Sequence, residues 1–110
     1  MPTPQRNHHA LAEALRGRVL DGDAESSVAN RRDAAAAAAG QTIGPGPYTL
    51  LAKQIGEAAH RVTDVQVADV VAAAGSQKAA FEIIAAAATG AGIMRWQRAI
   101  ATLESGTKCD

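Results

Sequence analysis

The chain ends in an alanine-rich segment, Thr63 to Ser105, which limits the fold more than any other stretch of the sequence. Its apolar spacing predicts a short helix over Asp64–Ala74 and a long helix over Gln77–Glu104. Alanine is the best helix former but adds little volume to a core, so such helices must pack with their backbones close together. Because β-branched residues are too scattered to build a sheet, the sequence predicts an all-α fold, a compact bundle of about five helices with a long C-terminal helix.

Start and stop signals delimit these two helices. Thr63 and Gln66 have the spacing of a capping box, in which each side chain bonds the backbone N–H of the other residue. Gly75 suits the left-handed position that ends a helix, and Ser76 can cap the helix that follows.

Two glycines, Gly90 and Gly92, fall inside the long predicted helix, where each costs about 1 kcal/mol relative to alanine. Next to the alanines of residues 85–88, they indicate a place where another backbone comes very close, or a kink. We expect the alanine and glycine face of residues 85–92 to mediate a homo-oligomer. The larger apolar residues of this helix recur at three- and four-residue spacing, as Phe81, Ile84 and Ala88, then Ile93, Trp96, Ile100 and Leu103.

Three further helices are predicted before this segment, over His9–Leu20, Ser27–Ala39 and Pro47–Val62. The first carries Leu11, Leu15 and Val19 as an apolar stripe, and the third carries Tyr48, Leu51, Ile55 and Ala59. The second contains six consecutive alanines, so we expect it to lie at the periphery or to pack closely on another surface of small residues. Asp21–Asp23 is predicted to be a turn, and the prolines and glycines of Gln41–Pro47 predict a rigid linker.

Length and charge limit the number of domains and the kinds of binding partner. With 110 residues the chain is expected to be one domain, residues 1–110, with a loose leader at 1–7 and a flexible tail at 105–110. Eleven basic and eleven acidic residues give a net charge of zero, which argues against nucleic-acid binding and against a polybasic membrane anchor. The N-terminus has no signal-peptide pattern, so we expect a cytoplasmic protein.

Few residues are candidates for chemistry. Glu57 and His60 lie three apart on the third predicted helix, where a carboxylate can orient a His for proton transfer; a solvated polar face is the alternative. Cys109 is the only cysteine in the sequence and lies next to the C-terminus, where an incidental thiol is expected. His8 and His9 point about 100° apart on a helix, so we expect no metal site and no cofactor.

Three stretches of the C-terminal half form a family pattern. They are the run His60–Val67, the turn Ala72–Ser76, and the helix from Phe81 to Ala88 followed by Gly90-Ala91-Gly92, Arg95 and Leu103. With these residues, the segment from Tyr48 to Leu103 resembles the carboxymuconolactone decarboxylase and alkylhydroperoxidase D-like superfamily. The resemblance implies a compact all-α bundle that assembles into trimers, hexamers or related oligomers.

The peroxidase branch of this superfamily uses a Cys-x-x-Cys pair followed four residues later by His, with a Glu assisting proton transfer. When His60 is placed on that His, the cysteine positions fall on Lys53 and Gly56, and neither residue can act as a redox nucleophile. The resemblance therefore implies the scaffold without the peroxidase thiols.

Three functional hypotheses follow. The first is an oligomeric binding or accessory protein of this superfamily, with a small-molecule ligand. The second is an enzyme with decarboxylase-like or altered peroxidase-like chemistry that uses Glu57 and His60 as a proton relay. The third is a structural helical partner of another chain. A closed apolar cavity around Glu57 and His60 would favour the second hypothesis, and solvated side chains would weaken it.

Overall fold

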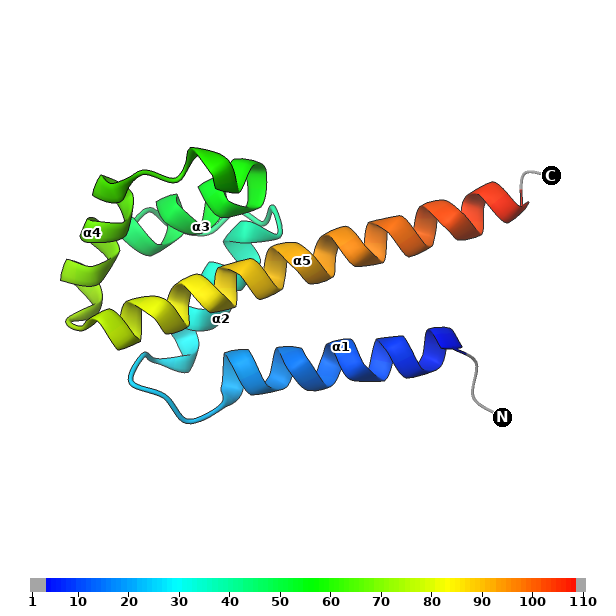
Figure 1. Cartoon of the computed structure of the whole chain (residues 1–110), viewed down its shortest axis with the longest axis horizontal. Helices are drawn as coiled ribbons and strands as arrows, with labels where there is room; N and C mark the ends of the chain where they lie inside the picture. Colours follow the sequence, from blue (N-terminus) through cyan, green and yellow to red (C-terminus); the bar gives the residue numbers. More distant parts are fainter. Residues whose placement is uncertain (1–3, 109–110) are drawn as a thin grey trace.

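Five α-helices and one short 3-10 turn make up most of the chain that the structure describes. It is a computed structural model, and it describes the backbone of residues 4–108 and the side chains of residues 9–105. In chain order the elements are α1 (Pro4–Asp21), α2 (Val28–Ala38), α3 (Pro47–Ala58), the turn η1 (Ala59–Arg61), α4 (Asp64–Ala74) and α5 (Gln77–Lys108) (Figure 1). The predicted all-α bundle with a long C-terminal helix is confirmed.

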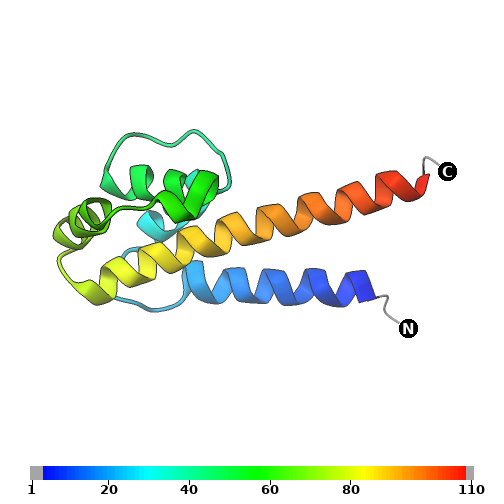
Figure 2. The same cartoon turned by 45° about the horizontal axis from the view of Figure 1, so that its top comes forward.

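The long helix α5 runs along the whole molecule, which measures 51 by 28 by 22 Å. Helix α1 lies antiparallel beside it, so the start of α1 and the end of α5 lie at the same end of the molecule, while α3 and α4 cover the other end (Figures 1 and 2). Helix α2 packs against α1, α3 and α5. Among the described residues, no single helix combines the length and hydropathy of a membrane span; α4 with residues 77–105 reaches both only as a pair bent by 117°.

The core is built mainly from alanines, and α2 lies at its centre. The largest buried cluster contains Ala34, Ala37, Ala38, Ala52, Ile83, Ala87 and Ala91. Of the two arrangements that the sequence left open for the six alanines, close packing on a surface of small residues is confirmed, and the peripheral position is wrong. A helix made of alanines has no distinct apolar and polar faces, so its sequence does not indicate how much of it is buried.

Two glycines allow α2 to touch its neighbours backbone to backbone. A Cβ atom built on Gly90 of α5 would collide with the carbonyl oxygen of Ala35, and one built on Gly56 of α3 would collide with that of Ala38. The close approach predicted at Gly90 is thus confirmed, with α2 of the same chain as the partner. Gly92 is exposed and has nothing within 4 Å of a built Cβ, and α5 continues through both glycines as one helix.

We expect Gly90→Ala and Gly56→Ala each to lower the free energy of unfolding by about 1–3 kcal/mol, because the added methyl group overpacks a backbone contact that cannot yield. Gly17→Ala is the matched control: Gly17 lies within α1 with nothing within 4 Å of a built Cβ, so this change should stabilise the protein by up to about 1 kcal/mol. Urea unfolding followed by circular dichroism measures all three. Equal effects at the three positions would contradict the close crossings.

The predicted caps are confirmed. The Gln66 N–H donates to the Thr63 hydroxyl at 3.2 Å, and the Thr63 N–H donates to the Gln66 side-chain oxygen at 2.9 Å. Gly75 adopts φ 87° after α4, and the Ser76 hydroxyl accepts from the Ala79 N–H at 3.0 Å at the start of α5.

Three boundaries differ from the sequence prediction. Helix α1 begins at Pro4, inside the expected leader, because a proline is tolerated in the first turn of a helix. Helix α5 continues to Lys108, into the expected tail. Helix α3 ends at Ala58, where φ is −161°, so the expected helix to Val62 is replaced by η1. Cys109 lies outside the described residues.

Several predicted apolar stripes face away from the core. Leu11 is 68% exposed and Leu15 52%, while Leu20 of the same helix is buried. On α5 the buried side carries Ile83 and the small residues near it, while Phe81 is 69% exposed. The stripe on α3 is better predicted, because Leu51 is buried and Tyr48 and Ile55 pack against it. Small residues carry the core contacts of α5, so its largest side chains do not mark its buried face.

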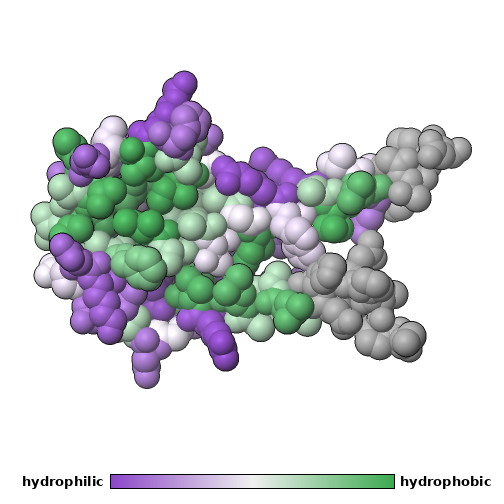
Figure 3. Space-filling model, in the orientation of Figure 1, coloured by the Kyte–Doolittle hydropathy of each residue, from purple (hydrophilic) through white to green (hydrophobic). Residues whose placement is uncertain are grey.

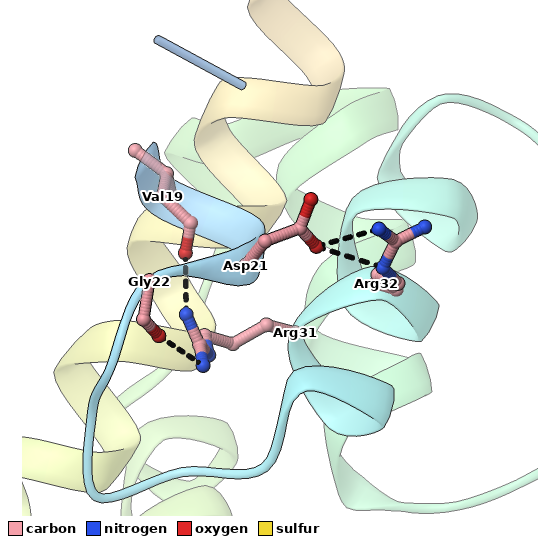
Figure 4. A network of polar contacts seen from close by, with 5 residues as sticks. All are labelled: Val19, Asp21, Gly22, Arg31 and Arg32. Carbon is pink, nitrogen blue, oxygen red and sulfur yellow. Dashed lines mark hydrogen bonds and ion pairs between the residues drawn. The ribbon is translucent and has the colours of Figure 1, made fainter. Parts of the chain in front are cut away.

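The end of α1 is held by a buried arginine from α2 (Figure 4). The Arg31 guanidinium donates to the Val19 carbonyl at 2.9 Å and to the Gly22 carbonyl at 2.7 Å, and only 3% of the residue is exposed. Its Nε atom is buried without a hydrogen-bond partner. A cation at the C-terminus of a helix is favourable because the free carbonyls carry negative charge. Next to it, Arg32 and Asp21 form an exposed ion pair at 2.6 Å.

A carboxylate from α5 holds the other end of the α1–α2 connection. Glu82 accepts the backbone N–H of Ser26 at 2.8 Å, the Ser26 hydroxyl at 2.8 Å and the Glu25 N–H at 3.2 Å. The Ser26 N–H is the main reason why the pKa of Glu82 is lowered from its usual 4.5; partial loss of hydration opposes the shift. The Ser76 hydroxyl in turn donates to Glu25 at 2.7 Å.

This lowered pKa gives a signed prediction for acid stability. Because folding favours the ionised form of Glu82, its contribution is fully present above pH 4.5, and it is lost as the pH falls through the lower folded pKa. Glu82→Gln should lower stability at neutral pH and flatten its dependence on pH below 4.5. Glu13→Gln, at an exposed position on α1, is the control and should keep the wild-type profile. Parallel profiles for the two variants would contradict the prediction.

Candidate functional site

A cleft of about 410 Å³ lies where the end of α2 and the connector after it meet α3 and α5. Small and apolar side chains line its inner part: Ala37, Ala38, Ile43 and Met94. Polar and charged groups complete it: Gln41, Thr42, Thr49, Lys53, Glu57 and Arg98. The cleft therefore combines apolar surface with hydrogen-bonding and charged groups, and it is more polar than most small-molecule sites, which are lined mainly by apolar side chains.

Local backbone chemistry creates this cleft. Gly40 adopts φ 97° after α2, a conformation that glycine reaches at little cost. The N–H groups of Gly40 and Gln41 close the end of the helix on the carbonyls of Ala37 and Ala36. The connector then leads to Pro47, where α3 begins, and the first three residues of the linker predicted over Gln41–Pro47, residues 41–43, form one wall of the cleft.

A second contact fixes the distance between α3 and α5 beside the cleft. The Arg95 guanidinium on α5 donates to the Gly56 carbonyl at 2.6 Å, close to the C-terminal end of α3. Gly56 is also the position at which α3 touches α2. The cleft wall on α3 is thus held from two sides, and its charged side chains project from a fixed helix.

The side chains that line the cleft carry a net positive charge. Lys53 and Arg98 bring two positive charges and Glu57 one negative charge. Lys53 and Glu57 are exposed residues of α3, and Arg98 is an exposed residue of α5. Within residues 9–105, none of the three side chains makes a hydrogen bond or an ion pair, whereas Arg32 and Arg95 both do. The two cations are thus available to an incoming ligand.

The structure separates the two residues predicted as a proton relay. Glu57 lines the cleft, but His60 lies in the turn η1, is exposed, and lines none of the cavities that we describe. Because α3 ends between them at Ala58, their spacing does not place them on one helical face, and no hydrogen bond joins them. Both side chains are solvated, the arrangement that weakens the relay hypothesis.

Sequence reasoning missed Lys53 and Arg98 as a pair. In the sequence Lys53 stood out only as the residue at a cysteine position of the peroxidase motif, and Arg98 lies on another helix. Both residues line one cleft because of the way α3 and α5 pack, and residue spacing within a single helix does not indicate that packing. The Gly40 stop and the proline-rich connector were the available signals, since long rigid connections next to helix ends often border binding sites.

Among the described residues, no three His, Cys, Asp or Glu side chains gather closely enough to hold a metal ion. His9 lies elsewhere, in a shallow groove with Trp96 and Ile100 between α1 and α5. Comparison of the chain with protein-family models, curated proteins and solved structures finds no match in any of the three.

Proposed function

We propose that this protein is an oligomeric binding or accessory protein of the carboxymuconolactone decarboxylase and alkylhydroperoxidase D-like kind, acting without thiol chemistry on a small organic anion. The observation that carries the proposal is the cleft with two cationic side chains, Lys53 and Arg98, that have no hydrogen-bond or ion-pair partner within residues 9–105. The sequence pattern from Tyr48 to Leu103 supports the family, and the lack of any Cys-x-x-Cys pair supports a role other than thiol peroxidase.

The composition of the cleft favours an anion with an apolar body. Arg98 can bind a carboxylate through two parallel hydrogen bonds, and Lys53 can add a second charged contact. Met94 and Ile43 add apolar surface to the same cleft. At about 410 Å³ the cleft falls within the range of typical ligand sites, which favours a compact molecule such as a substituted aromatic or alicyclic acid.

One observation favours an enzyme as the second candidate. Glu57 brings a carboxylate into the same cleft as the two cations, where it could exchange a proton with a bound acid. In this form of the hypothesis Glu57 acts without His60. Turnover of a bound carboxylic acid that is lost in Glu57→Gln would favour the enzyme over the binding protein.

The ligand class can be tested with a matched pair of probes, benzoate and benzylamine, which share a ring and differ in charge. We expect benzoate to shift the amide NMR signals of residues 40–43, 53–57 and 94–98, and benzylamine to leave them unchanged. Lys53→Gln with Arg98→Gln should weaken benzoate binding about tenfold or more, because both charged contacts are lost.

Lys78→Gln, at an exposed position on α5 outside the cleft, is the charge-matched control and should bind benzoate as the wild type does. Equal shifts with both probes, or benzoate shifts that persist in the double variant, would contradict the proposed ligand class.

The absence of peroxidase chemistry gives a separate prediction. With dithiothreitol as the reductant, reduction of cumene hydroperoxide should not exceed the rate without protein, because the chain has no resolving cysteine pair. Cys109→Ser identifies any contribution from the tail thiol. Clear turnover that persists in this variant would exclude the accessory role.

A further inference from the structure

A second cavity, of about 260 Å³, lies beside the cleft, where α1 meets α2 and α5. Ala35 and Gly90 form part of its lining, and these are the residues at which α2 and α5 touch backbone to backbone. Because that contact cannot shift without separating the two helices, this side of the cavity has a fixed shape. The position of the cavity is therefore set by the same crossing that holds the core together.

The cavity and the cleft are neighbours. Three residues line both of them: Ala39, Gln41 and Met94. The cleft lies on the α3 side of the end of α2, and the cavity lies on its α1 side. Packed helices are separated by about 8–10 Å, so a ligand that passes the end of α2 needs roughly that distance between its two ends. Met94 has a flexible, unbranched side chain, which can adapt to a chain that lies across it.

Helix α1 turns its charged side toward this cavity. Glu13 and Arg16 line it, and the helical repeat points them about 150° away from the exposed Leu11 and Leu15. In Figure 1 α2 passes behind α5, and in Figure 3, which has the same orientation, apolar colour covers part of α1 on the near face. The apolar side of α1 is thus turned away from α2, and its charged groups lie on the side of the cavity.

The polar side chains of the cavity are open to a ligand. Glu13 and Arg16 stand three residues apart, a spacing at which opposite charges on a helix often pair, yet within residues 9–105 neither makes an ion pair or a side-chain hydrogen bond. In the same part of the chain, the Gln41 and Gln97 side chains that also line the cavity make no hydrogen bond. A carboxylate, a guanidinium and two amides thus border one small volume.

This set of groups fits the head group of an α-amino acid. Its ammonium group can donate to the Glu13 carboxylate, and its carboxylate can accept two parallel hydrogen bonds from Arg16. The Gln41 and Gln97 amides can bond an uncharged polar chain next to the head group. A simple anion or a simple cation would leave one of the two charges unmatched, so a zwitterionic group suits the cavity better than either.

We propose that the cleft and the cavity hold one ligand, an α-amino acid whose side chain ends in a second acid roughly 10 Å away. The terminal acid lies with Lys53 and Arg98, and the head group lies between Glu13 and Arg16. Three cations and two carboxylates line the joined space, and their net charge of +1 matches the charge of −1 on such a ligand. The inference rests on the proposed function, because it takes the acid in the cleft as its starting point.

Three probes separate the two halves of such a ligand. γ-Glutamyl-4-aminobenzoate has a benzoate at one end and an amino-acid head group at the other, its N-glutaryl analogue lacks only the α-amino group, and benzoate is the terminal acid alone. We expect the γ-glutamyl probe to bind at least about tenfold more tightly than either of the others, because only it makes every charged contact. It should also shift the amide NMR signals of residues 13–16, in addition to those of residues 40–43 and 94–98.

Substitutions in the cavity separate its role from that of the cleft. Arg16→Gln should weaken binding of the γ-glutamyl probe about tenfold and leave benzoate binding unchanged, because benzoate reaches only the cleft. Glu13→Gln should remove the preference for the γ-glutamyl probe over its glutaryl analogue. Arg18→Gln, at an exposed position of α1 that lines neither the cleft nor the cavity, is the control and should bind all three probes as the wild type does. Circular dichroism melts confirm that each variant is folded.

The outcomes distinguish this inference from the proposed function. If benzoate does not bind, both fail. If benzoate binds but the γ-glutamyl probe binds no more tightly, or loses nothing in Arg16→Gln, only the inference fails, and the cleft takes a compact acid alone. A preference for the γ-glutamyl probe over its glutaryl analogue that disappears in Glu13→Gln supports the inference.

Discussion

Direct backbone contact of α2 with α3 at Gly56 and with α5 at Gly90 determines most of this structure. Helix α2 can lie at the centre of so small a bundle only because Gly56 and Gly90 let α3 and α5 reach its main chain. At such short separations a core needs little side-chain volume, so alanines fill it. The few large apolar residues then have little room inside. Leu11 and Leu15 of α1 and Phe81 and Leu103 of α5 are therefore exposed.

Local signals made much of the fold predictable. The Thr63 box, Gly75, Ser76 and the Gly40 stop act through backbone atoms within a few residues, so they can be identified without knowledge of the fold. Burial was harder to predict, because the usual guide is the size of apolar side chains. In α5 the small residues are buried and Phe81 is exposed, which is the reverse of that guide.

The candidate site was predictable only in part, for a related reason. Glu57 was identified from its residue type, but its pairing with His60 assumed that the third helix continues to Val62, whereas α3 ends at Ala58. The positive charges of the cleft come from α3 and α5, which each cross α2 at a glycine and are joined by the Arg95 hydrogen bond to the Gly56 carbonyl. No spacing within one helix indicates these contacts. The family resemblance rests on local caps and on alanine content, and these describe the scaffold better than the cleft.

The clamp formed by Arg31 has a consequence for motion. Its guanidinium donates to the Val19 and Gly22 carbonyls at the end of α1, whereas an open groove borders Ala12 and Leu15 between α1 and α5. Local opening of α1 is therefore expected to begin away from the end that Arg31 holds. Slow amide hydrogen exchange should therefore be confined to the last turns of α1, with protection fading toward the N-terminus in the isolated chain. A molecule that binds over α1 would therefore be detected as slower amide exchange in the N-terminal part of this helix.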